Sequence, residues 1–137
     1  MPSFRRFEEV EHTADLALKV HGHSLKEFFA NAAYGLFSLM ADLENLSPIV
    51  SREVHLEAPD RESLLVDWLN ELLYLHEVEE EIYIRFEIEA LSSTALSAIV
   101  WGGRIAASKL TVKAATFHDL EIRETEDGYL ATVVFDV

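Results

Sequence analysis

Residues 64–75 read Leu64-Leu65-Val66-Asp67-Trp68-Leu69-Asn70-Glu71-Leu72-Leu73-Tyr74-Leu75. Apolar side chains recur here three and four positions apart, which predicts a helix with a broad apolar face buried in a core. Asp60 stands where the cap of this helix is expected. An acidic run, residues 77–81, follows the apolar pattern, and carboxylates at a helix C-terminus oppose the helix dipole. We therefore expect the helix to begin after Asp60 and to end before Glu77.

The patterns on either side of this helix predict an α+β domain. Ser24-Leu25-Lys26-Glu27 is a capping box that opens an earlier helix, expected to end near Ala41. Asp127-Gly128 signals a hairpin turn. Strand patterns cover residues 14–20, 50–56, 82–89, 94–101, 109–118, 120–123 and 129–137. This order predicts one two-layer domain over residues 1–137, with two helices packed on one face of a largely antiparallel β-sheet.

The composition excludes several classes of function. The chain has 11 lysines and arginines against 25 aspartates and glutamates, which gives a net charge of -14. Such a surface repels phosphate backbones, so we expect no direct nucleic-acid binding. A basic protein partner or a cation fits this charge better, although the charge would also serve solubility alone.

The chain contains no cysteine, which excludes disulfides, zinc–thiolate sites and thiol nucleophiles. Neither a signal peptide nor an apolar stretch long enough to span a membrane is visible. We therefore expect a cytoplasmic protein that does not act at a membrane.

Acidic groups stand near both ends of the sequence. Asp15 follows His12-Thr13-Ala14, and strand-forming residues run directly into Phe135-Asp136-Val137. If the last strand lies beside the strand that starts at Asp15, the side chains of Asp15 and Asp136 and the α-carboxylate of Val137 converge. Three close carboxylates repel one another unless a cation or a proton lies between them. The hypothesis is a hard-cation site; the alternative is that Asp15 is an ordinary solvated strand residue.

Four other patterns are candidate sites. In the run 113–118, a continuous strand would place Lys113 on one face and Thr116 and His118 on the other. His21 and His23 have the spacing of a pair of transition-metal ligands. Gly22 between them suggests a turn and no third ligand is evident, so a role that does not involve a metal is favoured. Gly102-Gly103 predicts a bend rather than a phosphate-binding loop. Asn70 and Glu71 are interpreted either as a solvated helix flank or as a contact with a partner or a sheet.

Four of these blocks, in this order, resemble the archease family. They are Glu11-His12-Thr13-Ala14-Asp15, the helix at 64–75, the run 113–118, and Val133-Val134-Phe135-Asp136-Val137. One departure is visible: the family often has glycine soon after the first aspartate, where this chain has Leu16-Ala17, and a strand accepts both. Together the four blocks span nearly the whole chain, so the resemblance applies to its full length.

The resemblance implies a function that no single residue reveals. Archeases are accessory proteins of the GTP-dependent RNA ligase of tRNA splicing, where they promote guanylylation of the ligase's active-site histidine and sustain multiple turnover. The family binds a divalent cation, typically calcium, at positions that match Asp15, Asp136 and Val137, with magnesium and manganese as alternatives. A chaperone-like role toward an RNA methyltransferase has also been proposed for the family. His12 would then orient or flank Asp15, and Lys113 would offset the acidic groups or touch a nucleotide phosphate.

Two functions of other classes remain open at this point. A metal-dependent hydrolase would use Asp15 and Asp136 with His12 or His118 as the base, and it would turn over phosphoesters without any partner. A chaperone or scaffold would act through its surface, so that substitution of the carboxylates would have no effect. The activator hypothesis predicts that the protein is inert until the ligase is added.

Overall fold

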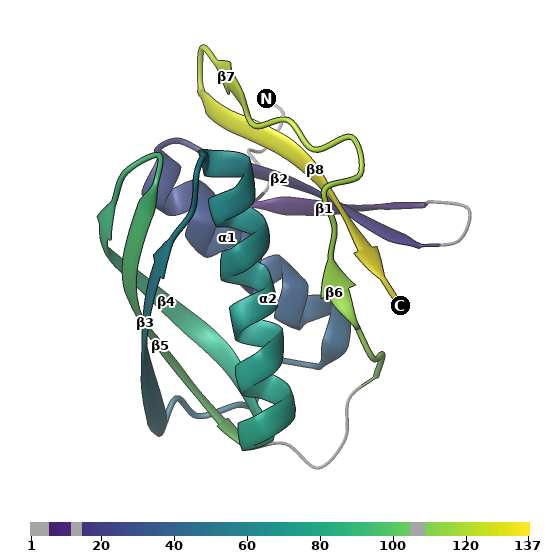
Figure 1. Ribbon diagram of the computed structural model, residues 1–137. Coiled ribbons are helices and arrows are strands. Elements are labelled where there is room, and N and C mark those ends of the chain that lie inside the picture. Colours follow the sequence, from purple (N-terminus) through teal and green to yellow (C-terminus); the bar gives the residue numbers. More distant parts are fainter. Residues whose placement is uncertain (1–5, 12–14, 105–108) are drawn as a thin grey trace.

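The strands form two antiparallel sheets that enclose the helices. The computed structural model describes residues 6–11, 15–104 and 109–137, with only the backbone described for residues 9–11. In the view of Figure 1, the helices lie between a sheet on the left and a sheet on the right. The prediction of an α+β domain with antiparallel strands is confirmed. The strands divide into two sheets instead of one.

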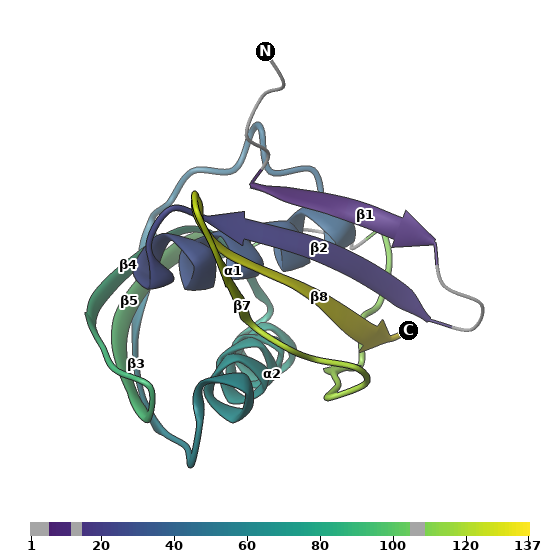
Figure 2. The ribbon, with the colours of Figure 1, turned by 90° about the horizontal axis from the view of Figure 1, so that it is seen from above.

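The five-stranded sheet is built from both ends of the chain. Its path is β1 (Phe7–Glu11), β2 (Leu16–Gly22), β8 (Gly128–Asp136) and β6 (Ala114–Ala115), and β7 (Arg123–Thr125) also pairs with β8. Figure 2 shows β8 lying alongside β2, with the C-terminus next to the start of β2. The condition on which the acidic-site hypothesis rests, that the last strand lies beside the strand after Asp15, is therefore met.

The three-stranded sheet comes from the middle of the chain. Its order is β3 (Val50–Glu57), β5 (Ala95–Arg104) and β4 (Glu81–Leu91), all antiparallel. Gly102 lies within β5, where a Cβ atom would come within 1.9 Å of the Ile82 carbonyl oxygen. Gly102 therefore marks a close approach of β5 to β4, and both glycines lie within β5 instead of at the predicted bend after a strand.

Helix α1 (Leu25–Met40) explains why two sheets form. The side chain of Ser24 accepts a hydrogen bond from the Glu27 backbone N–H at 3.1 Å, as the capping box predicts. The helix packs against β2 on one side and β4 on the other. Its buried side chains are too many for a single stripe: Phe28, Phe29, Asn31, Ala32, Ala33, Leu36, Phe37 and Met40. A helix that is buried nearly all round needs cover on two sides, which the two sheets supply.

Helix α2 (Arg61–Glu79) begins as predicted but runs further than predicted. Asp60 caps it, accepting a hydrogen bond from the Ser63 N–H at 2.7 Å. The helix continues through the acidic residues to Glu79 and closes at Glu80, which adopts the left-handed conformation (φ 57°). The expected end before Glu77 is wrong because Arg52 on β3 pairs with the Glu79 carboxylate at 3.0 Å and offsets its charge at the helix end.

Three β predictions need correction. Within residues 109–118 only Ala114–Ala115 is strand, and the segment predicted at 120–123 forms β7 slightly later, at Arg123–Thr125. The last hairpin is confirmed, but Thr125 pairs with Gly128, so its turn is Glu126-Asp127. Strand β1 was not predicted at all. Short edge segments such as β1 and β6 hold few apolar residues, so period-two patterning defines them poorly.

The core lies between the sheets, around α1 and α2. Trp68 of α2 is fully buried, and its indole N–H donates to the Phe29 carbonyl of α1 at 3.0 Å. The two helices are thereby joined at the centre of the apolar cluster. In the described part of the chain, every buried side-chain nitrogen and oxygen has a hydrogen-bond partner.

Candidate functional site

Strand register brings the two predicted aspartates to the same end of the five-stranded sheet. Leu16 pairs with Phe135 at the last step of the β2–β8 ladder. Asp15 directly precedes Leu16, and Asp136 directly follows Phe135. Val133, Val134 and Phe135 are all buried, and Asp136 is the first exposed residue after them. Asp15 is half-buried and lies just before the first residue of β2, so Asp15 and Asp136 flank the terminal Leu16–Phe135 pair on its outer side.

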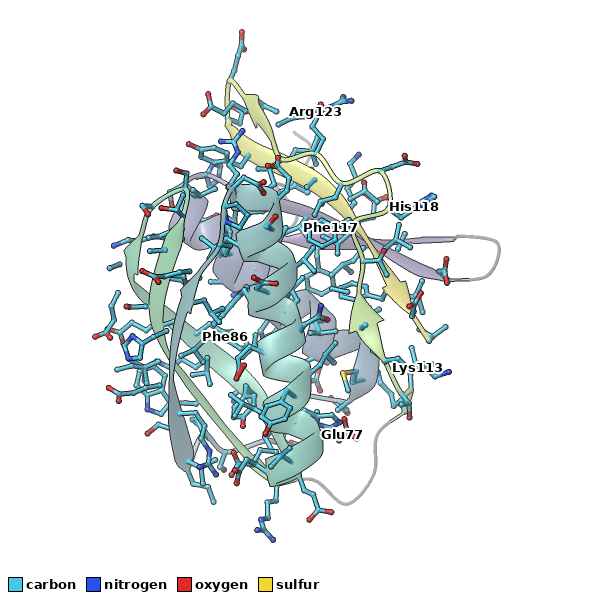
Figure 3. All side chains as sticks on the ribbon, viewed as in Figure 1. Glu77, Phe86, Lys113, Phe117, His118 and Arg123 are labelled. Atoms are coloured by element: carbon cyan, nitrogen blue, oxygen red, sulfur yellow. The ribbon has the colours of Figure 1, made fainter. Side chains whose placement is uncertain are left out.

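Strand β6 holds Asp136 from the other side. Ala114 pairs with Asp136, and the Lys113 N–H donates to the Asp136 carbonyl oxygen at 2.8 Å. Lys113 is exposed, and Figure 3 shows its side chain near the end of β8, pointing away from α2. The predicted supporting residue Lys113 therefore lies in the immediate neighbourhood of Asp136.

Thr116 and His118 belong to a different part of the surface. The Thr116 hydroxyl donates to the Val134 carbonyl oxygen at 2.9 Å and accepts from the His118 N–H at 3.3 Å. The His118 Nε2 atom lies 3.3 Å from an Asp119 carboxylate oxygen, and Figure 3 places His118 well along the sheet from Lys113. Only Ala114–Ala115 of the run 113–118 is strand, and Thr116 and His118 lie away from Lys113. Thr116 anchors the chain after β6.

The remaining predicted residues are Val137 and His12. Val137 ends the sequence beside Asp136, and 42% of its surface is exposed. His12 lies outside the described residues. In the described ranges, no three His, Asp or Glu side chains gather closely enough to hold a metal ion. The set expected from the sequence has two aspartate side chains and one main-chain carboxylate, so its donors are all oxygens. Oxygen donors suit a hard cation such as calcium or magnesium.

Among the residues that the structure describes, no third ligand joins His21 and His23 in a metal site. His21 is a strand residue at the end of β2, where its carbonyl accepts from the Asn31 amide at 2.8 Å. Burial, followed by the nearby Lys19 charge, lowers the pKa of His21. The His23 Nδ1 atom lies 3.0 Å from the Asp127 carbonyl oxygen. The contact of the His23 ring with a backbone carbonyl favours a structural role for that ring over metal binding, and Gly22 belongs to the strand and not to a turn.

The sequence did not predict the partners of two polar side chains, Asn70 and Arg52. The Asn70 amide on α2 bonds both backbone groups of Ala115, accepting from its N–H at 2.7 Å and donating to its carbonyl oxygen at 3.3 Å. Of the two interpretations of Asn70, the contact with a sheet is the one observed. Arg52 was not singled out, although a lone arginine in a predicted strand ahead of an acidic run is a recognisable signal.

A groove of about 460 Å³ runs between α2 and the segment before β6. Leu73, Tyr74 and Glu77 line it from the helix, and Lys113 lines it from the opposite side. Its charged groups are of both signs, so it lacks the basic character that binding of a nucleic acid requires. Neither described helix is long and apolar enough to cross a lipid bilayer.

Comparison with known families gives one consistent result. The model of the Archease protein family matches residues 7–137. The protein archease of Methanosarcina acetivorans is 40% identical over 146 aligned positions that cover all of both chains. The protein archease of Saccharolobus solfataricus is 41% identical over 138 positions, covering 97% of this chain and 99% of that one.

Solved structures agree with the sequence comparison. The solution structure of Methanobacterium thermoautotrophicum protein 1598 superposes with a TM-score of 0.79 at 33% identity, covering 96% of this chain and 99% of that one. A Thermotoga maritima crystal structure, described as an archease and possible chaperone, has a TM-score of 0.66 at 22% identity over the whole of both chains. At that identity the second likeness supports the fold alone.

Proposed function

Since this chain belongs to the archease family, we propose that it acts as an accessory protein that activates the GTP-dependent RNA ligase of tRNA splicing. In this proposal it promotes guanylylation of the ligase's active-site histidine and so sustains repeated turnover, without ligating RNA itself. The observation that supports the proposal is the pairing of Leu16 with Phe135, which puts their neighbours Asp15 and Asp136 at the same end of the five-stranded sheet. The net charge of -14 supports docking on a basic, RNA-binding enzyme in preference to RNA.

We further propose that this end of the sheet binds a divalent cation of the calcium type. The ligands would be the side chains of Asp15 and Asp136 and the α-carboxylate of Val137, here called the acidic tip. Calcium takes six to eight oxygen ligands, so water or a partner would complete the shell. Bound there, the cation would offset the repulsion among the carboxylates and supply positive charge for phosphate oxygens. Lys113 would add a second positive charge beside Asp136, and His12 would orient Asp15.

The proposed mechanism is one of placement. The acidic tip would approach the active site of the ligase and help to place metal and GTP for attack by the ligase's histidine. Holding reactants in position is a recognised source of large rate effects. Exposure of Asp136 and Lys113 leaves both side chains accessible to such a partner.

A turnover assay tests the activator proposal. RNA with 3′-phosphate or cyclic-phosphate and 5′-hydroxyl ends would be given in excess to a cognate GTP-dependent ligase, with and without this protein at substoichiometric amounts. We expect product to rise beyond one turnover per ligase only when the protein is present, and no product from the protein alone. Unchanged yield with a cognate ligase would contradict the proposal.

The second candidate function is a chaperone-like action on RNA-modifying enzymes such as an RNA methyltransferase. Exposed apolar side chains on one face of α2, Tyr74 and Val78, favour it, because they offer surface to an unfolded or apolar partner. Suppression of aggregation that does not depend on metal and survives loss of Asp15 and Asp136 would support this function over the first.

The terminal carboxylate gives a separate prediction. Deleting Val137 is expected to weaken calcium binding about tenfold, because one oxygen donor group moves away from its place. Val137→Ala keeps the carboxylate and removes only a partly exposed side chain, so its affinity should match that of the unsubstituted protein. Isothermal titration calorimetry measures both. Undiminished affinity after the deletion would exclude the α-carboxylate as a ligand.

A further inference from the structure

The short strand β6 has an unusual neighbour on its outer side. It is two residues long and lies at the edge of the five-stranded sheet. Toward β8, the N–H groups of Lys113 and Thr116 donate to the carbonyls of Asp136 and Val134. The backbone groups of Ala115 are instead bonded by the Asn70 side chain, at 2.7 and 3.3 Å. One amide thus takes the place of a missing neighbouring strand, since it satisfies both a donor and an acceptor of the edge.

Strand β6 in turn determines where Asp136 lies. The ladder between β2 and β8 ends at the pair Leu16–Phe135, one residue before Asp136. Beyond that pair, the backbone contacts of Asp136 are with β6, through the pairing with Ala114 and the 2.8 Å hydrogen bond from Lys113. A two-residue strand at a sheet edge has little stability of its own. The position of Asp136 therefore depends on what holds β6.

The anchor on α2 is rigid. Asn70 follows Trp68 and Leu69 directly, and both of these side chains are fully buried. Its backbone is thus fixed by the core, while its amide reaches out to the edge of the sheet. Through this contact the rigid core fixes the position of β6 and, with it, the end of β8. Supporting residues fix functional groups in other sites in the same way.

We propose that Asn70 is a positioning residue for the acidic tip, holding Asp136 in place through β6. The inference rests on the proposed cation site and adds a residue that touches neither the cation nor a carboxylate. Loss of the amide would let β6 separate from α2, and Asp136 and Val137 would then sample more positions. The entropy of reordering them would weaken cation binding.

The chain offers a matched control in Asn31. This residue is buried on α1, and its amide also donates to a sheet backbone group, the His21 carbonyl, at 2.8 Å. His21 pairs with Leu130, toward the opposite end of the β2–β8 ladder from Asp136. Asn31→Leu and Asn70→Leu therefore both remove a helix-to-sheet contact, but only the second removes it beside the acidic tip.

The experiment compares calcium affinity and amide hydrogen exchange in the full-length protein and both variants, at a temperature where all are folded. For Asn70→Leu we expect calcium affinity to fall about tenfold, as for loss of a supporting partner in other metal sites, and the Lys113 amide to exchange faster. Asn31→Leu should leave both quantities within about twofold even where it lowers the melting temperature. Asn70→Asp keeps the acceptor for the Ala115 N–H and should lie between the two.

The two proposals fail in different ways. Absence of calcium, magnesium or manganese binding in the unsubstituted protein would overturn the cation site itself. Equal affinity in the unsubstituted protein and Asn70→Leu would overturn the positioning role. So would unchanged exchange of the Lys113 amide, with or without metal, or an equal loss of affinity in Asn31→Leu.

Discussion

Asp136→Ala is expected to abolish stimulation of the RNA ligase while leaving the fold intact, and Asp15→Ala is expected to do the same. Both residues stand outside the core, since Asp136 is exposed and Asp15 is only half-buried. Each substitution removes a donor group of the proposed cation site. Calcium affinity should fall by at least the ~10–100-fold that loss of a supporting partner of a ligand costs. The ligase turnover assay and calorimetric titration with calcium measure the two effects.

Thermal unfolding separates this effect from a loss of structure. Without metal, the variants should melt at or slightly above the temperature of the unsubstituted protein, because repulsion among the carboxylates is reduced. Calcium in excess should raise the melting temperature of the unsubstituted protein, since it binds only the folded state. The two variants should show a smaller rise at the same calcium concentration, because their affinity is lower. The sign of the metal-free change is therefore a test of whether the acidic groups are close together.

Asp127→Ala provides the control for charge. Asp127 lies in the turn before β8, at the opposite end of the strand from Asp136, so the substitution removes the same charge elsewhere on the same strand. Stimulation and calcium affinity should be retained. If Asp127→Ala lowers stimulation as much as Asp136→Ala, net charge and not the acidic tip carries the activity. Retained stimulation in Asp15→Ala or Asp136→Ala would contradict the assignment of the site.

Local signals in the sequence were predictive where the interaction itself is local. Ser24 and Asp60 each cap a helix through a residue three positions on, so the sequence pattern contains the whole contact. The end of α2 was mispredicted because its cause is distant: Arg52 lies 27 residues before Glu79. Repulsion with the helix dipole is a correct local argument, but a tertiary ion pair outweighs it here.

The same distinction applies to the candidate site. The convergence of Asp15 and Asp136 could be stated only as a condition, because strand pairing between the two ends is a property of the whole sheet. Asn70 could be seen as a polar residue beside an apolar face, but its partner Ala115 lies 45 positions away. Nothing in the alternation of residues 109–118 indicates that only two of them form strand. What escaped prediction is thus a set of side-chain contacts with the backbone at a sheet edge.

The largest effect on stability is expected at a buried carboxylate near the end of α2. Glu81 opens β4, and its side chain is 4% exposed. Arg52 binds both of its oxygens, through Nε at 3.0 Å and Nη2 at 2.9 Å, and the Tyr83 hydroxyl donates to one of them at 2.7 Å. Buried charges are tolerated when they are paired and hydrogen-bonded in this way. The contacts of Arg52 and Glu81 thus connect β3 with β4 beside the end of α2.

Arg52→Met is expected to lower the free energy of unfolding by about 2–3 kcal/mol at pH 7, because it removes two hydrogen bonds and the closest positive charge from the buried Glu81 carboxylate. Chemical denaturation measures this change. Met replaces the aliphatic part of the arginine side chain and removes the charged guanidinium group. Replacing both partners, as Arg52→Met with Glu81→Gln, should recover more than half of the loss, since a neutral amide still accepts from Tyr83.

The pH dependence of this stability difference tests whether the Arg52–Glu81 ion pair is its cause. In the folded protein the Arg52 hydrogen bonds hold the pKa of Glu81 below its usual value of 4.5, against the opposing effect of burial. The pair therefore stabilises the fold fully above about pH 4.5, and this contribution is lost as the pH falls through the lowered pKa. Arg52 is the largest cause of the lowered pKa of Glu81, so without it the carboxylate takes up a proton at a higher pH than in the unsubstituted protein, which relieves the penalty of burying its charge. The gap in stability between Arg52→Met and the unsubstituted protein should shrink as the pH falls from 7 to about 4. A gap that stays constant over this range would show that Arg52 acts through packing alone.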